Sequence, residues 1–126
     1  MAIMDPSDIP AGRAHLDPDD RRLLLRMELC AEQGRFEEAQ DLAEELWLEA
    51  VDAHKRLYQG LANAFTAAAA RAALQRRGAR EIAARTRRML EPFPHCVLDL
   101  ELDTLLDSLD ALIERGDGTL LMRRQG

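Results

Sequence analysis

The sequence is poor in the residues that favour a β-sheet. Aromatic side chains make up only 4% of the 126 residues, and leucine and alanine supply most of the apolar material. Aromatic and β-branched residues suit a pleated sheet, whereas a core of leucine and alanine favours closely spaced helices. The composition therefore predicts an all-α fold, and the length predicts one domain with a single core.

Long apolar runs and a secretory signal are also missing. No uninterrupted apolar stretch approaches the roughly 18 residues of a membrane span. The N-terminus carries Asp5 and Asp8 where a signal peptide would be basic and then apolar. We therefore expect a cytoplasmic protein without a membrane segment.

Positive charge is in deficit and cysteine is scarce. The net charge of −6 argues against nonspecific binding to nucleic-acid phosphates, which requires a surplus of cations. Cys30 and Cys96 lie in unrelated segments and lack the spacing of metal or redox motifs. We expect both to be ordinary buried thiols and expect no cofactor.

Apolar periodicity and helix-ending glycines predict a compact bundle of about five helices, arranged as antiparallel hairpins without a sheet. The expected helices cover about 18–33, 35–51, 53–77, 80–90 and 99–115. Residues 97–102 alternate as a strand would, but nothing else in the chain could pair with them. We therefore expect Asp99 to cap the last helix.

The predicted domain spans residues 18–116. Before it, residues 1–17 contain prolines and no periodic apolar pattern, which predicts a flexible leader able to pack across the domain. After it, residues 117–126 are expected to form a frayed C-terminal tail.

Two neighbouring predicted helices carry polar side chains in an otherwise apolar seam. At about 100° per residue, Gln40 falls within the apolar arc of its helix and Glu44 lies at the border of that arc. Residues 57–70 include no charged side chain, which predicts a central helix with Gln59 and Asn63 on its polar strip. The resulting candidate polar site consists of Gln40, Glu44, Trp47, Gln59 and Asn63.

This site has two interpretations. We favour a buried network in which the amides and the carboxylate satisfy one another and fix the register of the helices. The alternative is a small enzyme or ligand binder, in which a groove around Glu44 orients a polar substrate. A metal is not expected, because one carboxylate is too few ligands and the histidines at 15, 54 and 95 lie outside the site.

A second feature is a cluster of arginines around the predicted fourth helix. Its members are Arg76, Arg77, Arg80, Arg85, Arg87 and Arg88. They would form either a docking site for nucleic acid or an acidic protein, or a solvated face that complements the acidic second helix. Because no aromatic residues for base stacking are interleaved, we expect the solvated face.

Several segments resemble domain-of-unknown-function family 309, a group of small helical bacterial and archaeal proteins. They are GRFEEAQDLAEELWLEA, LYQGLANAFTAAAA, LEPFP and LDLELDTLLDSLDAL, within about residues 20–115. The family's first motif corresponds to Phe36, Glu38, Ala39, Gln40, Asp41, Glu44 and Trp47. Its second motif corresponds to Gln59, Gly60, Leu61 and Asn63.

The chain departs from that family at two places. Gln40 occupies the usual position of a histidine, and residues 79–83 lack the glycine pattern that starts the family's fourth helix. The resemblance implies a divergent member with a small helical fold, and it implies no activity, because the family's role is unassigned.

From these features we expect a noncatalytic domain that acts by association, as a homo-oligomer or with a protein partner. No catalytic residue is predicted. A polar-site enzyme or ligand binder is the first alternative, and nucleic-acid binding through residues 76–88 is the second.

Overall fold

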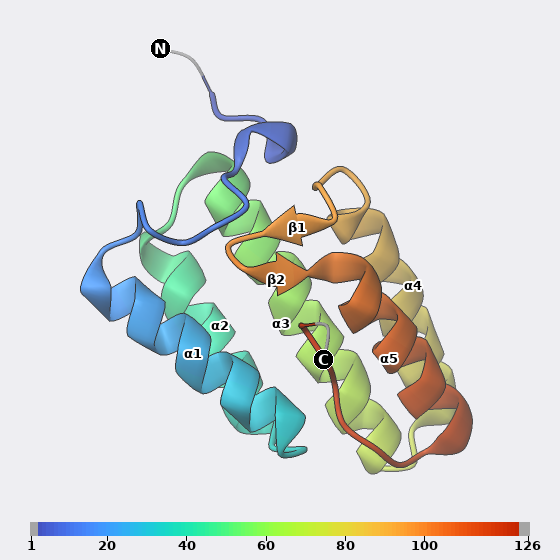
Figure 1. The fold of residues 1–126 in the computed structure, drawn as a ribbon. Helices are drawn as coiled ribbons and strands as arrows, with labels where there is room; N and C mark the ends of the chain where they lie inside the picture. The colour runs from blue at the N-terminus through green and yellow to red at the C-terminus, as the bar shows by residue number, and fades with distance from the viewer. Residues whose placement is uncertain (1–2, 124–126) are drawn as a thin grey trace.

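The structure, a computed structural model, describes residues 3–123 and is built from five helices. These are α1 (Pro18–Glu32), α2 (Phe36–Glu49), α3 (Asp52–Ala72), α4 (Arg76–Leu90) and α5 (Leu102–Arg115), preceded by the 3-10 turn η1 (Pro6–Asp8). Figure 1 shows α3 in the middle, with α2 and α4 on either side of it. Helix α1 packs on α2, and α5 contacts both α3 and α4. The predicted all-α bundle is confirmed.

The core is centred on α3, whose uncharged stretch predicted such a position. Leu57, Leu61 and Phe65 are fully buried, and Gly60 lets α4 approach closely. A Cβ atom at Gly60 would lie 2.5 Å from Cδ2 of Leu90, so the close contact depends on glycine. Along residues 3–123, no helix is both long and apolar enough to cross a bilayer.

Capping and glycine signals in the sequence predicted the first helical hairpin, α1 and α2, correctly. Asp17 caps α1, where its Oδ1 accepts a hydrogen bond of 2.8 Å from the backbone N–H of Asp20. Gly34 takes the left-handed conformation, with φ 77°, immediately after the C-cap residue Gln33. Helix α2 then begins at Phe36, one residue after the predicted start.

The boundary between α3 and α4 was predicted wrongly. We expected a helix through Arg77 that ends at Gly78, but α3 ends at Ala72 and Gly78 lies inside α4. Leu74 takes the left-handed position instead, with φ 63°. Its side chain is 77% exposed, and the turn is closed by a bond from Gln75 N to Ala70 O of 2.9 Å.

Residues 96–101 form a small hairpin that the sequence did not predict. Strands β1 (Cys96–Val97) and β2 (Leu100–Glu101) pair antiparallel. The two turn residues, Leu98 and Asp99, both have positive φ, of 50° and 62°, as a tight two-residue turn requires. The segment thus pairs with itself, so the expectations of no sheet and of Asp99 as a helix cap were wrong, and α5 begins at Leu102.

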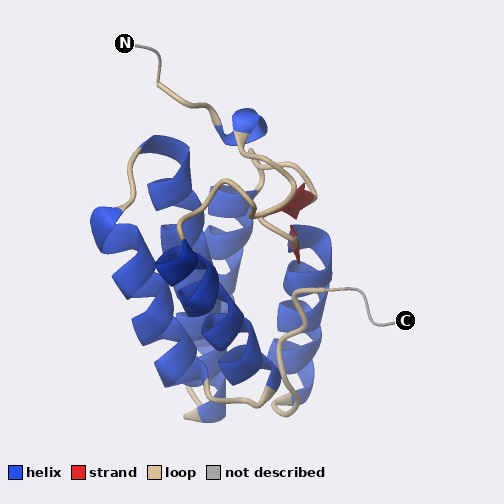
Figure 2. Cartoon of the chain, turned by 60° about the vertical axis from the view of Figure 1, so that its left-hand side comes forward, coloured by secondary structure: helices blue, strands red, loops and turns tan. Residues whose placement is uncertain are grey.

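The chain segments on either side of the predicted domain pack on the helices. Ile9 is only 4% exposed, and the hairpin N–H groups of Leu98 and Asp99 bond the carbonyl oxygens of Pro10 and Ala11 at 3.0 and 2.6 Å. Figures 1 and 2 show this N-terminal segment at the same end of the bundle as the two strands.

The described part of the C-terminal segment, residues 117–123, contributes to the core as well. Leu120 and Met122 are fully buried. The N–H of Leu121 donates to Oγ of Ser108 on α5 at 3.0 Å, and Leu120 N contacts Ala31 O of α1 at 3.4 Å. The segment therefore returns between α1 and α5, as Figure 1 shows.

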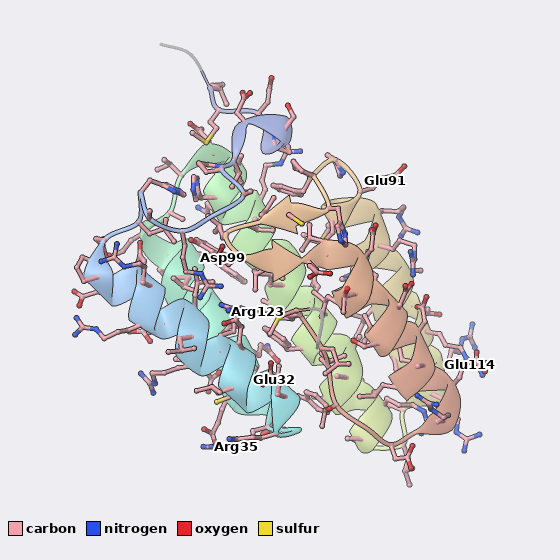
Figure 3. All side chains as sticks on the ribbon, in the orientation of Figure 1. Glu32, Arg35, Glu91, Asp99, Glu114 and Arg123 are labelled. Carbon is pink, nitrogen blue, oxygen red and sulfur yellow. The ribbon has the colours of Figure 1, made fainter. Side chains whose placement is uncertain are left out.

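Both segments are held by one buried carboxylate on α1. Glu28 is 3% exposed and accepts hydrogen bonds from Arg13 and from Arg123. The shortest contacts are 3.1 Å from Nη2 of Arg13 and 2.8 Å from Nε of Arg123. Figure 3 labels Arg123 on the C-terminal segment. We refer to Arg13, Glu28 and Arg123 as the Glu28 clamp.

Candidate functional site

The structure divides the predicted polar site between separate partners. Gln40 Nε2 donates to Oε1 of Glu44, one turn further along α2, at 3.1 Å. Asn63 Nδ2 instead contacts Sδ of Met89, on α4, at 2.8 Å. No hydrogen bond between described residues joins Gln40 or Glu44 to Gln59 or Asn63.

All five predicted residues, including Trp47, are half-buried and lie at the edge of the core. Five surface hollows are lined by other residues, and none includes a member of this set. The role of these side chains in binding or catalysis stays a prediction.

Replacing Glu44 tests whether the polar site stabilises the fold. A half-buried pair four residues apart on a helix contributes only a few tenths of a kcal/mol. We therefore expect Glu44→Ala to change the free energy of unfolding by less than about 1 kcal/mol in urea denaturation. Glu45→Ala, at the exposed neighbouring position, is the matched control. A loss above about 2 kcal/mol for Glu44→Ala alone would indicate a buried network instead.

The predicted arginine cluster lies on α4, and all six side chains are exposed. Arg80, Arg87 and Arg88 line a hollow of about 570 Å³ between α4 and α5. Acidic residues of α5 line it too, and Asp110 forms an ion pair with Arg87. Figure 3 shows Glu114, another lining residue, on α5. Since carboxylates are mixed in and no aromatic ring lines the hollow, its chemistry does not favour a nucleic acid.

The two histidines that sequence reasoning set aside meet at one end of the bundle. His15, before α1, and His54, on α3, have their Nε2 atoms 3.2 Å apart, and their rings meet edge to face. Tyr58 lies one turn after His54, with the ring centres 6.4 Å apart. The spacing of His54 and Tyr58 on one helix face was visible in the sequence. No spacing signal linked His15 to them.

A hollow of about 280 Å³ lies beside these rings, which also line it. Its other charged lining residues are Asp17, Asp20 and Glu49. Burial raises the pKa of Asp20, and the carboxylates of Asp17 and Glu49 raise it further. Burial also strongly raises the pKa of Tyr58, whose hydroxyl is therefore neutral at ordinary pH.

His54 should make folding stability depend on pH. Burial, and then the neighbouring His15, lower the pKa of His54 below its ordinary 6.5. The unfolded chain consequently binds a proton at His54 more readily than the folded chain does. The stability that neutral His54 preserves is therefore fully present above about pH 6.5 and is lost as pH falls towards the lower pKa of the folded state. In urea denaturation between about pH 7.5 and about pH 5.5, we expect the wild type to lose more stability than His54→Gln. Parallel profiles would contradict this assignment.

Among residues 3–123, no group of three or more histidine, cysteine or acidic side chains is placed to hold a metal ion. Cys30 is buried as expected, but Cys96 is exposed at the start of β1, so the prediction for Cys96 was wrong. Both thiols are free.

The fold and these surfaces define the chain as a small all-helical domain. No family model matches it, and neither curated proteins nor solved structures give a significant match. The resemblance to family 309 consequently stays a prediction.

Proposed function

We propose that this chain is a noncatalytic association domain whose acidic helix α2 binds the basic helix α4 of a second copy. The observation that carries the proposal is the separation of charge between two helices on opposite sides of α3. Helix α2 contains six carboxylates and no basic residue, whereas α4 contains six arginines and one carboxylate.

The two faces cannot neutralise each other within one molecule. Helices α2 and α4 each pack on α3, which lies between them (Figure 1). A second copy can bring the opposite charges together, and complementary charge favours encounter and orientation of the partners. Because the faces differ, the contact is heterologous and can produce rings or longer assemblies.

Exposed and unpaired charges supply the contact. On α2, Glu37 and Asp41 are exposed, and on α4 so are Arg80 and Arg88. Within the described chain, none of these four side chains forms an ion pair. Their charges are therefore available to a partner, and reversing them should leave the fold intact.

Apolar side chains at matching ends of the two helices add burial. Leu48, in the last turn of α2, is 75% exposed, and Leu74, just before α4, is 77% exposed. Antiparallel docking of α2 on α4 would bring these leucines together at one end and set Glu37 near Arg88 at the other. Burial of such side chains stabilises association beyond the charge pairs.

Charge reversal on one face, followed by mixing, tests the proposal. We expect Glu37→Arg/Asp41→Arg, and separately Arg80→Glu/Arg88→Glu, to weaken self-association about tenfold or more. The two variants mixed together should recover it, because each retains one native face and the reversed faces are again opposite in charge. Sedimentation velocity at low salt measures all three samples.

A matched control separates the α4 face from net charge. Lys55→Glu/Arg56→Glu changes the net charge as much as the α4 variant, at exposed positions of α3. Its association should weaken far less than that of the α4 variant. Equal loss in both variants, or no recovery on mixing, would rule out the α2–α4 contact.

A further inference from the structure

The hollow beside His15, His54 and Tyr58 lies apart from the charged helix α4 and has features of a ligand site. It forms where the chain before α1 passes the end of α2 and the start of α3. Its polar lining consists of His15, Asp17, Asp20, Glu49, His54 and Tyr58. Leu16, Ala50 and Val51 complete it with apolar surface.

Tyr58 carries a buried polar group without a partner. The residue is 2% exposed, and its hydroxyl makes no hydrogen bond with any described residue. Nearly all buried polar groups in proteins are hydrogen-bonded, and an unpaired one destabilises the fold. Tyr58 also lines the hollow, so its hydroxyl can pair with a polar atom of a ligand that binds there.

The field at the hollow is negative. Asp17, Asp20 and Glu49 form no ion pair with the described residues. The neighbouring arginines are engaged elsewhere, since Arg13 binds Glu28 and Arg21 donates to the carbonyl oxygens of Ala14 and Leu16. A cation entering the hollow would relieve the repulsion between the carboxylates.

We infer that this hollow binds a small organic cation with a primary ammonium group. Its three N–H donors match the Tyr58 oxygen, a carboxylate of Asp20 or Glu49, and Nε2 of His54 in the tautomer that leaves this nitrogen unprotonated. The apolar lining residues contact the alkyl part. An ammonium fits better than a bare metal ion, because residues 3–123 place no three metal ligands together.

Contact with the hydroxyl requires a small movement, since the group is covered by the surrounding atoms. His15 is exposed and lies on the segment before α1, and its ring meets His54 edge to face. Both rings line the hollow together with Tyr58, and we expect rotation of the His15 ring to widen the access to Tyr58. His15→Ala should therefore bind the cation at least as well as the wild type does.

Titration of the full chain with n-butylammonium, followed by amide NMR shifts, tests the site. We expect saturable shifts at Tyr58 and its neighbours, and none with n-butanol, which lacks the charge. Asp20→Asn/Glu49→Gln should weaken binding about tenfold or more. Asp19→Asn, a carboxylate outside the hollow that pairs with Arg22, is the matched control and should bind unchanged.

Tyr58→Phe provides a readout that does not depend on the carboxylates. Removing the unpaired hydroxyl should raise the thermal midpoint without amine and reduce the further rise caused by amine. The inference would be overturned by equal shifts with butanol and n-butylammonium, or by an unchanged amine affinity in both Asp20→Asn/Glu49→Gln and Tyr58→Phe. Saturable binding of Zn²⁺ without amine binding would overturn it as well. Failure here leaves the α2–α4 contact untouched, since that proposal is tested on Glu37, Asp41, Arg80 and Arg88.

Discussion

Glu28→Ala is expected to lower the free energy of unfolding by about 3 kcal/mol or more. Glu28 is buried and binds two guanidinium groups, from Arg13 and Arg123. The Arg13 side chain is only 11% exposed, so without its carboxylate it remains a poorly solvated charge. Breaking a buried ion pair by removing one partner is among the costliest substitutions.

The effect should reach both ends of the chain. Arg13 also donates through Nε to Leu98 O of the hairpin at 2.9 Å, so losing the clamp loosens the N-terminal segment as well. Arg123 is 47% exposed, and we expect Arg123→Ala to cost less than Arg13→Ala.

Thermal and urea denaturation measure the change at Glu28. A loss of about 3 kcal/mol corresponds to a midpoint about 10 °C lower for a domain of this size. Glu45→Ala, at an exposed position of α2, serves as control and should stay within about 0.5 kcal/mol of wild type. If Glu28→Ala proved as mild as this control, the clamp would not stabilise the fold.

Gly60→Ala is expected to destabilise the protein by about 1–2 kcal/mol, even though alanine is the better helix former. The added Cβ would lie 2.5 Å from Cδ2 and 3.1 Å from Cγ of Leu90. Leu90 is 2% exposed and has little room to shift. Overpacking should therefore exceed the gain in helix propensity.

Gly78→Ala is the matched control for this helix contact. Gly78 lies in α4, and a Cβ there would meet nothing within 4 Å. The same substitution should then stabilise by about 0.5–1 kcal/mol through helix propensity alone. Urea denaturation compares the free energies of unfolding of the two variants. A change of the same sign in both would contradict the close approach of α3 and α4.

The elements predicted correctly are those set by local signals. Asp17 and Pro18 define the start of α1, and Gly34 defines its end. The uncharged stretch 57–70 likewise predicted a central α3, because a helix without charges has to be covered by others. The fold class followed from these patterns.

The elements that were missed depend on conformations or contacts that spacing does not reveal. Leu74 adopts the left-handed conformation after α3, whereas we expected the helix to end at Gly78, so the α3–α4 boundary was misplaced. The hairpin was not predicted because its two strands pair with each other within residues 96–101, whereas we looked for a partner strand elsewhere in the chain. A glycine is favoured at positive φ, but Leu98 and Asp99 occupy the turn.

The contacts of Glu28 and of His54 show the same limit of prediction from sequence. Glu28 lies on the buried stripe of α1 with Leu24 and Met27, a position where a carboxylate signals a buried partner. Its partners, Arg13 and Arg123, lie outside the periodic segments, so no pattern could name them. His15 was missed as a neighbour of His54 for the same reason.

The mass of the wild-type chain in solution, measured by sedimentation velocity over a concentration series, tests the central proposal most directly. At about 50 mM salt we predict assemblies larger than one chain, and at about 500 mM salt, where exposed charges are screened, single chains. A chain that stays monomeric at both salt concentrations, or an assembly that salt does not weaken, would contradict association through α2 and α4.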